Sequence, residues 1–394
     1  MSLVLTGVRV LDFGRFVAGP FCAALLADYG ADVIRIDRPG GGEDRYLMPV
    51  TEAGEGALFL QVNRNKRSIT LDIDKPEGRE VVKRLVRGAD VVIANMPPGT
   101  LKKVGLDYPT LKEIRHDIIL TASSAFGADE QNVNRLGFDG IGQAMSGAVF
   151  MSGLPEQPTK AMVPFVDFST ALASALGTMA ALFERQRSGV GQVVETSLMR
   201  TALNIGSGAL IEEAILEIGR EPTGNRSPIA GPSDIFRTSD GWIIVQVIGH
   251  YLFKRWSEVI GRPELVDDPS FKDDLTRGKN GAALSAIMSE WCASRTTEEA
   301  IATLSKARIP AGPVLSPRQV LDADKAQPSG HFSHVDYPGL PRNAPLVSSP
   351  ASLSRTPPSI RSRAPTLGEH TWEVLLEEGY TREEIEALER GGII

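Results

Sequence analysis

Short apolar stretches alternate with amphipathic segments through the first half of the chain. The stretches at 8–13, 31–36 and 89–95 are apolar along almost their whole length, and a helix-like segment that begins at Pro20 connects the first two. Strands of this kind are typical of parallel sheets that helices cover on both faces. The pattern therefore predicts an α/β fold whose first part is Rossmann-like.

The same alternation continues to about residue 218. Further strands are expected within 62–74 and at 117–123 and 192–197, and helices are expected at 76–88, 108–115, 171–185 and 198–218. The composition then shifts to Gly, Pro and Asn, which indicates a linker. A hairpin turn at Asp240-Gly241 and three later helices suit a small α+β domain. We expect a large domain at 1–220, completed by about 326–394, and a small domain at 225–325.

Composition limits the possible partners. The chain has 394 residues, 42% of them hydrophobic, and a net charge of −7 without blocks of like charge, so neither nucleic acid nor an anionic membrane is expected to bind. Cys22 and Cys292 form no paired motif, and the five histidines show no metal-ligand spacing; we expect buried thiols and no metal site. The N-terminus has no pattern of a signal peptide, which favours a cytoplasmic protein.

Polar side chains gather where the predicted strands end. Arg38, Asp74 and Asn95 each follow an apolar strand, and in open parallel sheets ligands collect at the carboxyl ends of strands. Asp37 could hold a ribose, but the first turn reads GRFVAG and lacks the glycine pattern that lets a backbone approach a pyrophosphate. We therefore expect a ligand site here, but no nicotinamide cofactor. As a lone residue, Arg38 could equally be a solvated surface cation.

Asp167 is the single charge in the otherwise uncharged segment 162–183. A carboxylate in such a setting needs a partner, a capping role or a chemical use, because its desolvation is costly. One interpretation is that it caps the small-residue helix that follows. The other is that the positive end of that helix keeps it ionised at neutral pH and that it attacks an activated acyl group.

Several motifs together resemble one family. The run LTGVRVLDFGRFVAGPFCAALLADYGADVIRIDRPGGGEDR, the segment NRNKRSITLDIDKPEG, the FDGIGQAMSG helix, the Asp167 segment and the terminal APTLGEHT occur in the order of the class III CoA-transferases. This family, also called CaiB/BaiF-like, includes formyl-CoA transferase and carnitine CoA-transferase. The similarity covers nearly the whole chain, and it implies that the ligand is coenzyme A.

The resemblance implies a reaction and a nucleophile. Asp167 would attack an acyl-CoA to give an aspartyl anhydride, then an aspartyl-CoA thioester, and a small carboxylic acid would accept the CoA. Covalent catalysis of this kind requires that water is excluded. No metal and no nicotinamide takes part. The family also implies a homodimer of two interlocked rings.

The resemblance also carries over residues that contact CoA. Lys103 stands where an Arg is common, and it could still neutralise a phosphate, although it cannot bind one bidentately. The positions that match the family's binding residues are Val17, Ala18, Arg38, Leu71, Asp72, Ile73, Asp74, Asn95, Met96, Pro97, Lys103, Arg135, Gly137, Phe138 and Asp139.

Two alternatives stay open. Related acyl-CoA racemases and epimerases carry a His before the Asp of the FDG segment, and this chain has Phe138 there, which favours transfer because two-base proton exchange would lose a partner. The chain could instead be a catalytically silent acyl-CoA-binding protein in which Asp167 only caps its helix. The segment GNRSPIAGPSDIF also replaces the tetraglycine loop of formyl-CoA transferase, which speaks against formate and oxalate as substrates.

Overall fold

The structure, a computed structural model, describes residues 3–127, 131 and 135–394. The chain divides into two compact units: residues 1–146, 162–211 and 330–394 form the first, and residues 147–161 and 212–329 form the second. The first unit is therefore discontinuous in sequence. Segment 147–161 falls in the second unit, although it lies within the 1–220 range expected for the large domain.

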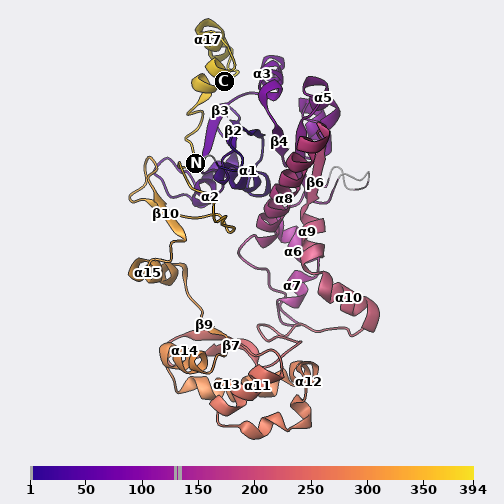
Figure 1. Ribbon diagram of the computed structural model, residues 1–394, viewed down its shortest axis with the longest axis vertical. Helices are drawn as coiled ribbons and strands as arrows, with labels where there is room; N and C mark the ends of the chain where they lie inside the picture. The colour runs from indigo at the N-terminus through magenta and orange to yellow at the C-terminus, as the bar shows by residue number, and fades with distance from the viewer. Residues whose placement is uncertain (1–2, 128–130, 132–134) are drawn as a thin grey trace. The chain divides into compact units, whose positions relative to one another are not determined.

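A six-stranded parallel sheet forms the centre of the first unit (Figure 1). Its strand order is β3-β2-β1-β4-β5-β6, so the order reverses between β1 and β4. The predicted α/β class is confirmed. Five strands lie within about two residues of their expected bounds, and β3 is a shorter strand inside the expected range 62–74. The strands are β1 Arg9–Asp12, β2 Asp32–Asp37, β3 Lys66–Thr70, β4 Val91–Ala94, β5 Ile119–Ser124 and β6 Val193–Ser197.

Helices cover both faces of this sheet. On one face, α1 packs against α8 over a core of alanine and larger aliphatic side chains, and both contact the sheet. On the other face, α3 and the C-terminal helices share a second core with the strands. The helices of this unit are α1 Ala18–Asp28, α2 Ala57–Val62, α3 Pro76–Gly88, α4 Pro98–Val104, α5 Tyr108–Ile114, α6 Asp139–Met145, α8 Phe165–Ser188, α9 Leu198–Ile205, α16 Thr371–Glu377 and α17 Arg382–Arg390, with the 3-10 turn η1 Glu43–Tyr46.

Two predicted helices differ from the observed ones. The helix expected at 171–185 begins earlier, at Phe165, so Asp167 lies inside its first turn. The long helix expected at 198–218 is divided at Gly206 into α9 and α10 (Ser207–Leu216). Among the described helices, α8 is the one long and apolar enough to span a membrane, and here it packs against α1, β5 and β6.

The chain returns at its end to the first unit. The hairpin of β10 (Phe332–Val335) and β11 (Ala344–Val347) packs with Phe59 and Leu60 of α2. Residues 370 and 371 then pair with the outer edge of β3, where the Ser68 N–H donates to His370 Nδ1 at 3.2 Å and the Thr70 N–H donates to Thr371 Oγ1 at 3.0 Å. This contact covers an edge strand that would otherwise be open.

The second unit is a small α+β body with its own core. Its antiparallel sheet has the order β7-β8-β9, and the Asp240-Gly241 turn connects β7 and β8 as predicted. The elements of the second unit are α7 Ala148–Met151, β7 Ser233–Arg237, β8 Trp242–Gln246, α11 His250–Val259, η2 Pro263–Val266, η3 Pro269–Phe271, α12 Asp274–Lys279, α13 Gly281–Ala293, α14 Thr297–Lys306, β9 Ala311–Pro313 and α15 Pro317–Ala326.

Both cysteines of the chain, Cys22 in the first unit and Cys292 in the second, are free and buried, as expected.

Candidate functional site

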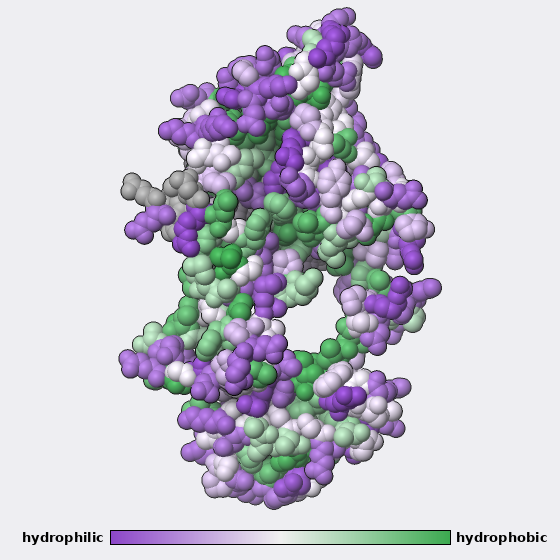
Figure 2. All heavy atoms as spheres, turned by 180° about the vertical axis from the view of Figure 1, so that it is seen from behind, coloured by the Kyte–Doolittle hydropathy of each residue, from purple (hydrophilic) through white to green (hydrophobic). Residues whose placement is uncertain are grey.

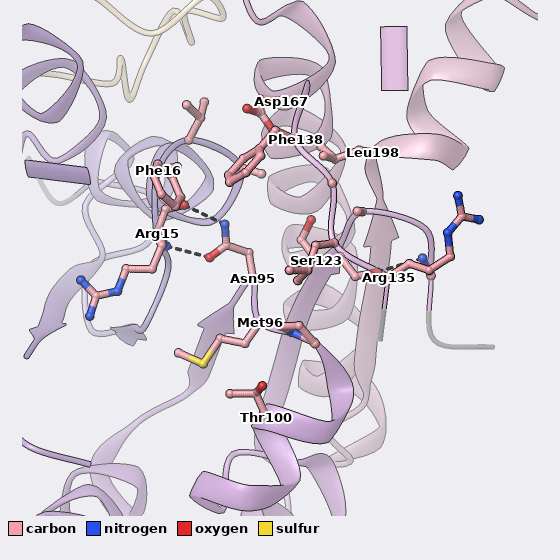
Figure 3. Close-up of a pocket in the computed structure, with 18 residues that line it drawn as sticks. Arg15, Phe16, Asn95, Met96, Thr100, Ser123, Arg135, Phe138, Asp167 and Leu198 are labelled. Carbon is pink, nitrogen blue, oxygen red and sulfur yellow. Dashed lines mark hydrogen bonds between the residues drawn. The ribbon is translucent and has the colours of Figure 1, made fainter. Parts of the chain in front are cut away.

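A cavity of about 290 Å³ opens at the carboxyl ends of β1, β4 and β5, where the strand order of the sheet reverses. Crevices at such switch points are where α/β proteins bind ligands. The first turn of α8 adds Asp167 to the wall (Figure 3). The cavity is lined by Arg15, Phe16, Val17, Ala18, Asn95, Met96, Pro97, Thr100, Ser123, Ser124, Ala125, Gly127, Arg135, Leu136, Gly137, Phe138, Asp167 and Leu198.

The first wall of the cavity is the turn between β1 and α1. Asn95, which follows β4, holds this turn on both sides: its Oδ1 accepts from the Arg15 N–H at 2.7 Å, and its Nδ2 donates to the Arg15 carbonyl at 2.7 Å. The next residue, Phe16, has a φ of 60°. Residues other than glycine rarely adopt this left-handed backbone conformation. The two hydrogen bonds from Asn95 therefore maintain a strained conformation beside the cavity.

A buried ion pair supports the residues at which this turn begins. Lys66 Nζ lies 2.7 Å from Asp12 Oδ2, and Asp12 Oδ1 accepts from the Gly14 N–H at 2.8 Å. Both side chains are fully buried. Burial lowers the pKa of Lys66 to about 8, although Asp12 opposes this change. Because each polar atom has a partner, the network fixes the start of the turn rather than leaving an uncompensated charge in the core.

A second buried network lies beside the first and holds the loop after β2. Asp37 lies 3.0 Å from Arg35 and 2.6 Å from Arg45, and Arg35 also pairs with Asp44 at 2.6 Å. Burial alone would raise the pKa of Asp37, but the two arginines lower it to about 2. The carboxylate at the position considered for a ribose is therefore already paired inside the protein.

Asp167 lies in the first turn of α8 and does not cap it. The residue before the helix is Pro164, and its side chain accepts no hydrogen bond. The first N–H groups of the helix bind Asp139, whose Oδ2 accepts from the Val166 N–H at 2.8 Å and from the Asp167 N–H at 3.0 Å. The interpretation that Asp167 caps the helix is therefore wrong. The side chain of Asp139 on α6 caps it instead. The Asp167 carboxyl is left facing the cavity (Figure 3).

The protonation of Asp167 also differs from the expectation. Burial, and after it the negative charge of Asp139, raises the pKa of Asp167 from 3.8 to about 7. Near neutral pH the Asp167 carboxyl can therefore be protonated or ionised, and ionisation yields a poorly solvated carboxylate, which is a strong nucleophile.

Two aromatic rings lie next to this carboxyl. Phe16 and Phe138 meet edge to face, with ring centroids 5.4 Å apart and an interplanar angle of 84°. Leu198 at the start of α9 adds a further apolar group to the wall. Leu198 is buried, whereas Phe138 is 63% exposed, so the wall beside Asp167 is apolar but reaches the protein surface at Phe138.

The residues predicted to contact CoA fall into two groups. Val17, Ala18, Met96, Pro97 and Gly137 line the cavity, as do Asn95, Arg135 and Phe138. The Asn95 side chain is occupied by the Arg15 backbone, and the Arg135 guanidinium lies 3.9 Å from the centre of the Phe126 ring.

The second group lies outside this cavity. Arg38 is exposed and pairs with Glu43 at 2.8 Å, and Lys103 lies 3.7 Å from Asp74 at the surface. Leu71 is buried, and the next residue, Asp72, donates its N–H to the Ile393 carbonyl at 2.7 Å. Ile73 packs against the core next to Leu71. Asp139 is buried behind the cavity wall.

Sequence reasoning missed the other residues of the wall, namely Arg15, Phe16, Thr100, Ser123, Ser124, Ala125, Gly127, Leu136 and Leu198. Ser123 and Ser124 end β5, so the rule that ligands gather at the carboxyl ends of strands would have found them. Phe16 had no such signal, because its left-handed backbone depends on Asn95, 79 positions later in the chain.

Comparison with known proteins places the chain in a family. Residues 5–371 match CoA-transferase family III. The chain is 33% identical over 399 residues to the succinyl-CoA–D-citramalate CoA-transferase of Chloroflexus aurantiacus, covering 99% of this chain and 98% of the relative. It is also 33% identical over 389 residues to the succinyl-CoA:mesaconate CoA-transferase of Haloarcula hispanica, covering 95% of this chain and 96% of the relative.

A solved structure is similar over the whole fold. The CAIB/BAIF family protein from Brucella suis superposes with a TM-score of 0.83 at 32% identity, covering 96% of this chain and all of that protein. The match in sequence and in fold spans both units. The chain belongs to CoA-transferase family III and is an enzyme of the CoA-transferase type.

Proposed function

We propose that this enzyme moves CoA from an acyl-CoA, with succinyl-CoA as the donor, to a small carboxylic acid, and that Asp167 is the nucleophile. The observation that carries the proposal is the Asp167 carboxyl, which faces a mainly apolar cavity with a pKa raised to about 7. Relatives whose names specify succinyl-CoA with citramalate and with mesaconate support this choice of donor and a dicarboxylic acceptor.

The first half of the reaction would leave CoA on the enzyme. An oxygen of ionised Asp167 forms a bond to the thioester carbonyl carbon, and the C–S bond breaks so that CoA leaves as a thiolate. The thiolate then attacks the aspartyl carbonyl of this anhydride and releases the donor acid. The product is an aspartyl-CoA thioester, and no proton is consumed in these two steps.

The second half reverses these bonds with the acceptor. Its carboxylate attacks the aspartyl thioester and expels the CoA thiolate, which then attacks the acceptor carbonyl of the new anhydride and restores the Asp167 carboxylate. Each intermediate hydrolyses if water reaches it, so the apolar wall of Phe16, Phe138 and Leu198 supports the mechanism by limiting access.

We assign CoA to an extended path from the cavity to the surface. The pantetheine arm would pass Val17, Ala18 and Asn95–Pro97, next to residues 135–139. The adenine would lie near residues 71–74, and Arg38 and Lys103 would neutralise phosphates. Arg38 would then exchange its Glu43 partner for the ligand.

We further propose that the protein is a homodimer, as the family implies. Helix α10 has no buried residue, and it exposes Ile211, Ile215 and Leu216 at 58%, 72% and 62%. Figure 2 shows further hydrophobic patches on the face it displays. Open apolar surface of this kind marks an interface. The interlocking of two rings and a cytoplasmic location stay predictions.

Trapping the covalent intermediate tests the proposal. The enzyme is incubated with succinyl-CoA, treated with hydroxylamine and digested, and the peptide that contains Asp167 is analysed by mass spectrometry. A hydroxamate on Asp167 is expected in the parent and none in Asp167→Asn. Turnover by Asp167→Asn, or solvent deuterium at the α-carbon of a 2-methylacyl-CoA without acyl exchange, would contradict the proposal and favour a racemase.

A further inference from the structure

The hydrogen-bond donors around the cavity are mostly occupied. The Asn95 amide is bonded to the Arg15 backbone, and the Arg15 guanidinium lies 3.3 Å from Asp44. Ser124 Oγ accepts from the Gly127 N–H at 2.9 Å, which holds this side chain at the turn after β5. These contacts fix all three side chains in place.

Ser123 differs from these neighbours. It is the fifth residue of β5, lines the cavity and is only 5% exposed. Among the residues that the structure describes, none forms a hydrogen bond with its hydroxyl. Figure 3 shows Ser123 beside Asn95, with an oxygen directed toward Phe138 and Asp167. A hydroxyl that has no protein partner and opens into a cavity beside a nucleophile is free to form a hydrogen bond with a ligand there.

A second set of donors lies on the opposite wall of the same cavity. Helix α1 begins at Ala18, and no side chain caps its first turn. The first N–H groups of a helix lack partners within the helix, and they form its positive end. Val17 and Ala18 both line the cavity, so these N–H groups and the Ser123 hydroxyl border the same space.

We propose that Ser123 is a further catalytic residue, whose hydroxyl donates a hydrogen bond to the thioester carbonyl oxygen while Asp167 attacks. When the Asp167 oxygen bonds to the carbonyl carbon, an electron pair of the C=O bond moves onto that oxygen. The Ser123 hydroxyl and the first N–H groups of α1 stabilise this negative charge. The pair then returns to restore C=O as the C–S bond breaks and the CoA thiolate leaves. The inference rests on the function proposed above.

The kinetic test uses Ser123→Ala and rapid mixing with succinyl-CoA. Loss of one such donor is expected to slow formation of the Asp167 adduct about 100-fold. The dissociation constant for free CoA and the melting temperature should stay close to the parental values, and Ser123→Thr should restore most of the rate. Ser174→Ala is the matched control, since Ser174 is buried on α8 and its hydroxyl lies 2.8 Å from Thr196 Oγ1, outside the cavity. It should lower the melting temperature and leave the rate unchanged.

An infrared measurement tests the contact directly. Succinyl-CoA with a ¹³C-labelled thioester carbonyl is bound to Asp167→Asn, where chemistry is blocked, and the carbonyl stretch should lie below its value in solution. Introducing Ser123→Ala into the Asp167→Asn variant should remove part of this shift of the carbonyl stretch. An unchanged shift, together with a parental adduct rate in Ser123→Ala, would overturn the assignment of Ser123. If the parent forms no Asp167 adduct, the proposed function fails, and the infrared shift still decides whether Ser123 contacts the carbonyl.

Discussion

The raised pKa of Asp167 has a consequence for stability. Its pKa is about 7 in the folded protein and 3.8 in an unstructured chain, so the folded state retains a proton that the unfolded state releases. Stability should therefore fall as the pH rises from about 4 to about 7 and then become constant. At 1.36 kcal/mol per unit of pKa, the ionised carboxylate costs at most about 4 kcal/mol. Because the carboxyl is partly exposed, we expect about 2 kcal/mol.

Replacement of Asp167 by Asn removes this cost. At pH 8 the Asp167→Asn variant should be more stable than the parent by about 2 kcal/mol, and the difference should vanish near pH 4. Urea unfolding followed by circular dichroism at a series of pH values measures the difference. The variant should be inactive at every pH, so stability and activity change in opposite directions, as is common for catalytic groups held in unfavourable surroundings.

Asp117 provides a control of opposite sign. Its hydrogen bond from Arg115, 2.8 Å long, lowers the pKa of Asp117, so its ionised form stabilises the fold. Asp117→Asn should reduce stability at neutral pH, with the loss disappearing at low pH. If Asp167→Asn is destabilised at pH 8, or if its difference from the parent does not depend on pH, the surroundings of Asp167 have been misjudged.

Three further predictions concern the site. Asp139→Asn removes the charge that, after burial, raises the pKa of Asp167, so the pH at which kcat/KM reaches half of its maximum should fall by about 1 unit. An unchanged pH profile would show that the charge of Asp139 does not affect the pKa of Asp167. Arg38→Ala should weaken CoA binding roughly fivefold at low salt and have little effect at high salt, as calorimetry can test. Phe138→Ala removes the edge contact with Phe16, should cost no more than about 1.5 kcal/mol, and should admit bulkier acceptor acids in a substrate screen.

Much of the fold follows from local patterns. The apolar strands at 8–13, 31–36 and 89–95 require burial on both faces, and this requirement already indicates a parallel sheet. The position of the site follows as well, because Asn95 and the turn after β1 end neighbouring strands. The break at Gly206 could not be predicted in this way, since the apolar spacing continues across it from α9 into α10.

The roles of single residues were harder to predict. Asp167 looked like a helix cap because residue types near a helix start suggest one, yet the cap is Asp139, 28 positions earlier. The conformation of Phe16 and the free hydroxyl of Ser123 likewise depend on which distant groups are already paired. Such properties arise from tertiary contacts, and local sequence patterns carry no signal for them.

The pairing of residues 370 and 371 with β3 has a consequence for synthesis of the protein. About 300 residues separate the two partners in the chain, so a ribosome adding 5 to 20 residues per second makes the second partner about 15 to 60 s after the first. During this time the nascent sheet carries an open strand edge and an incomplete core beneath α3. We expect newly made chains to depend on chaperones in this interval, and a ribosome-bound fragment that ends before residue 370 to aggregate more readily than the full chain.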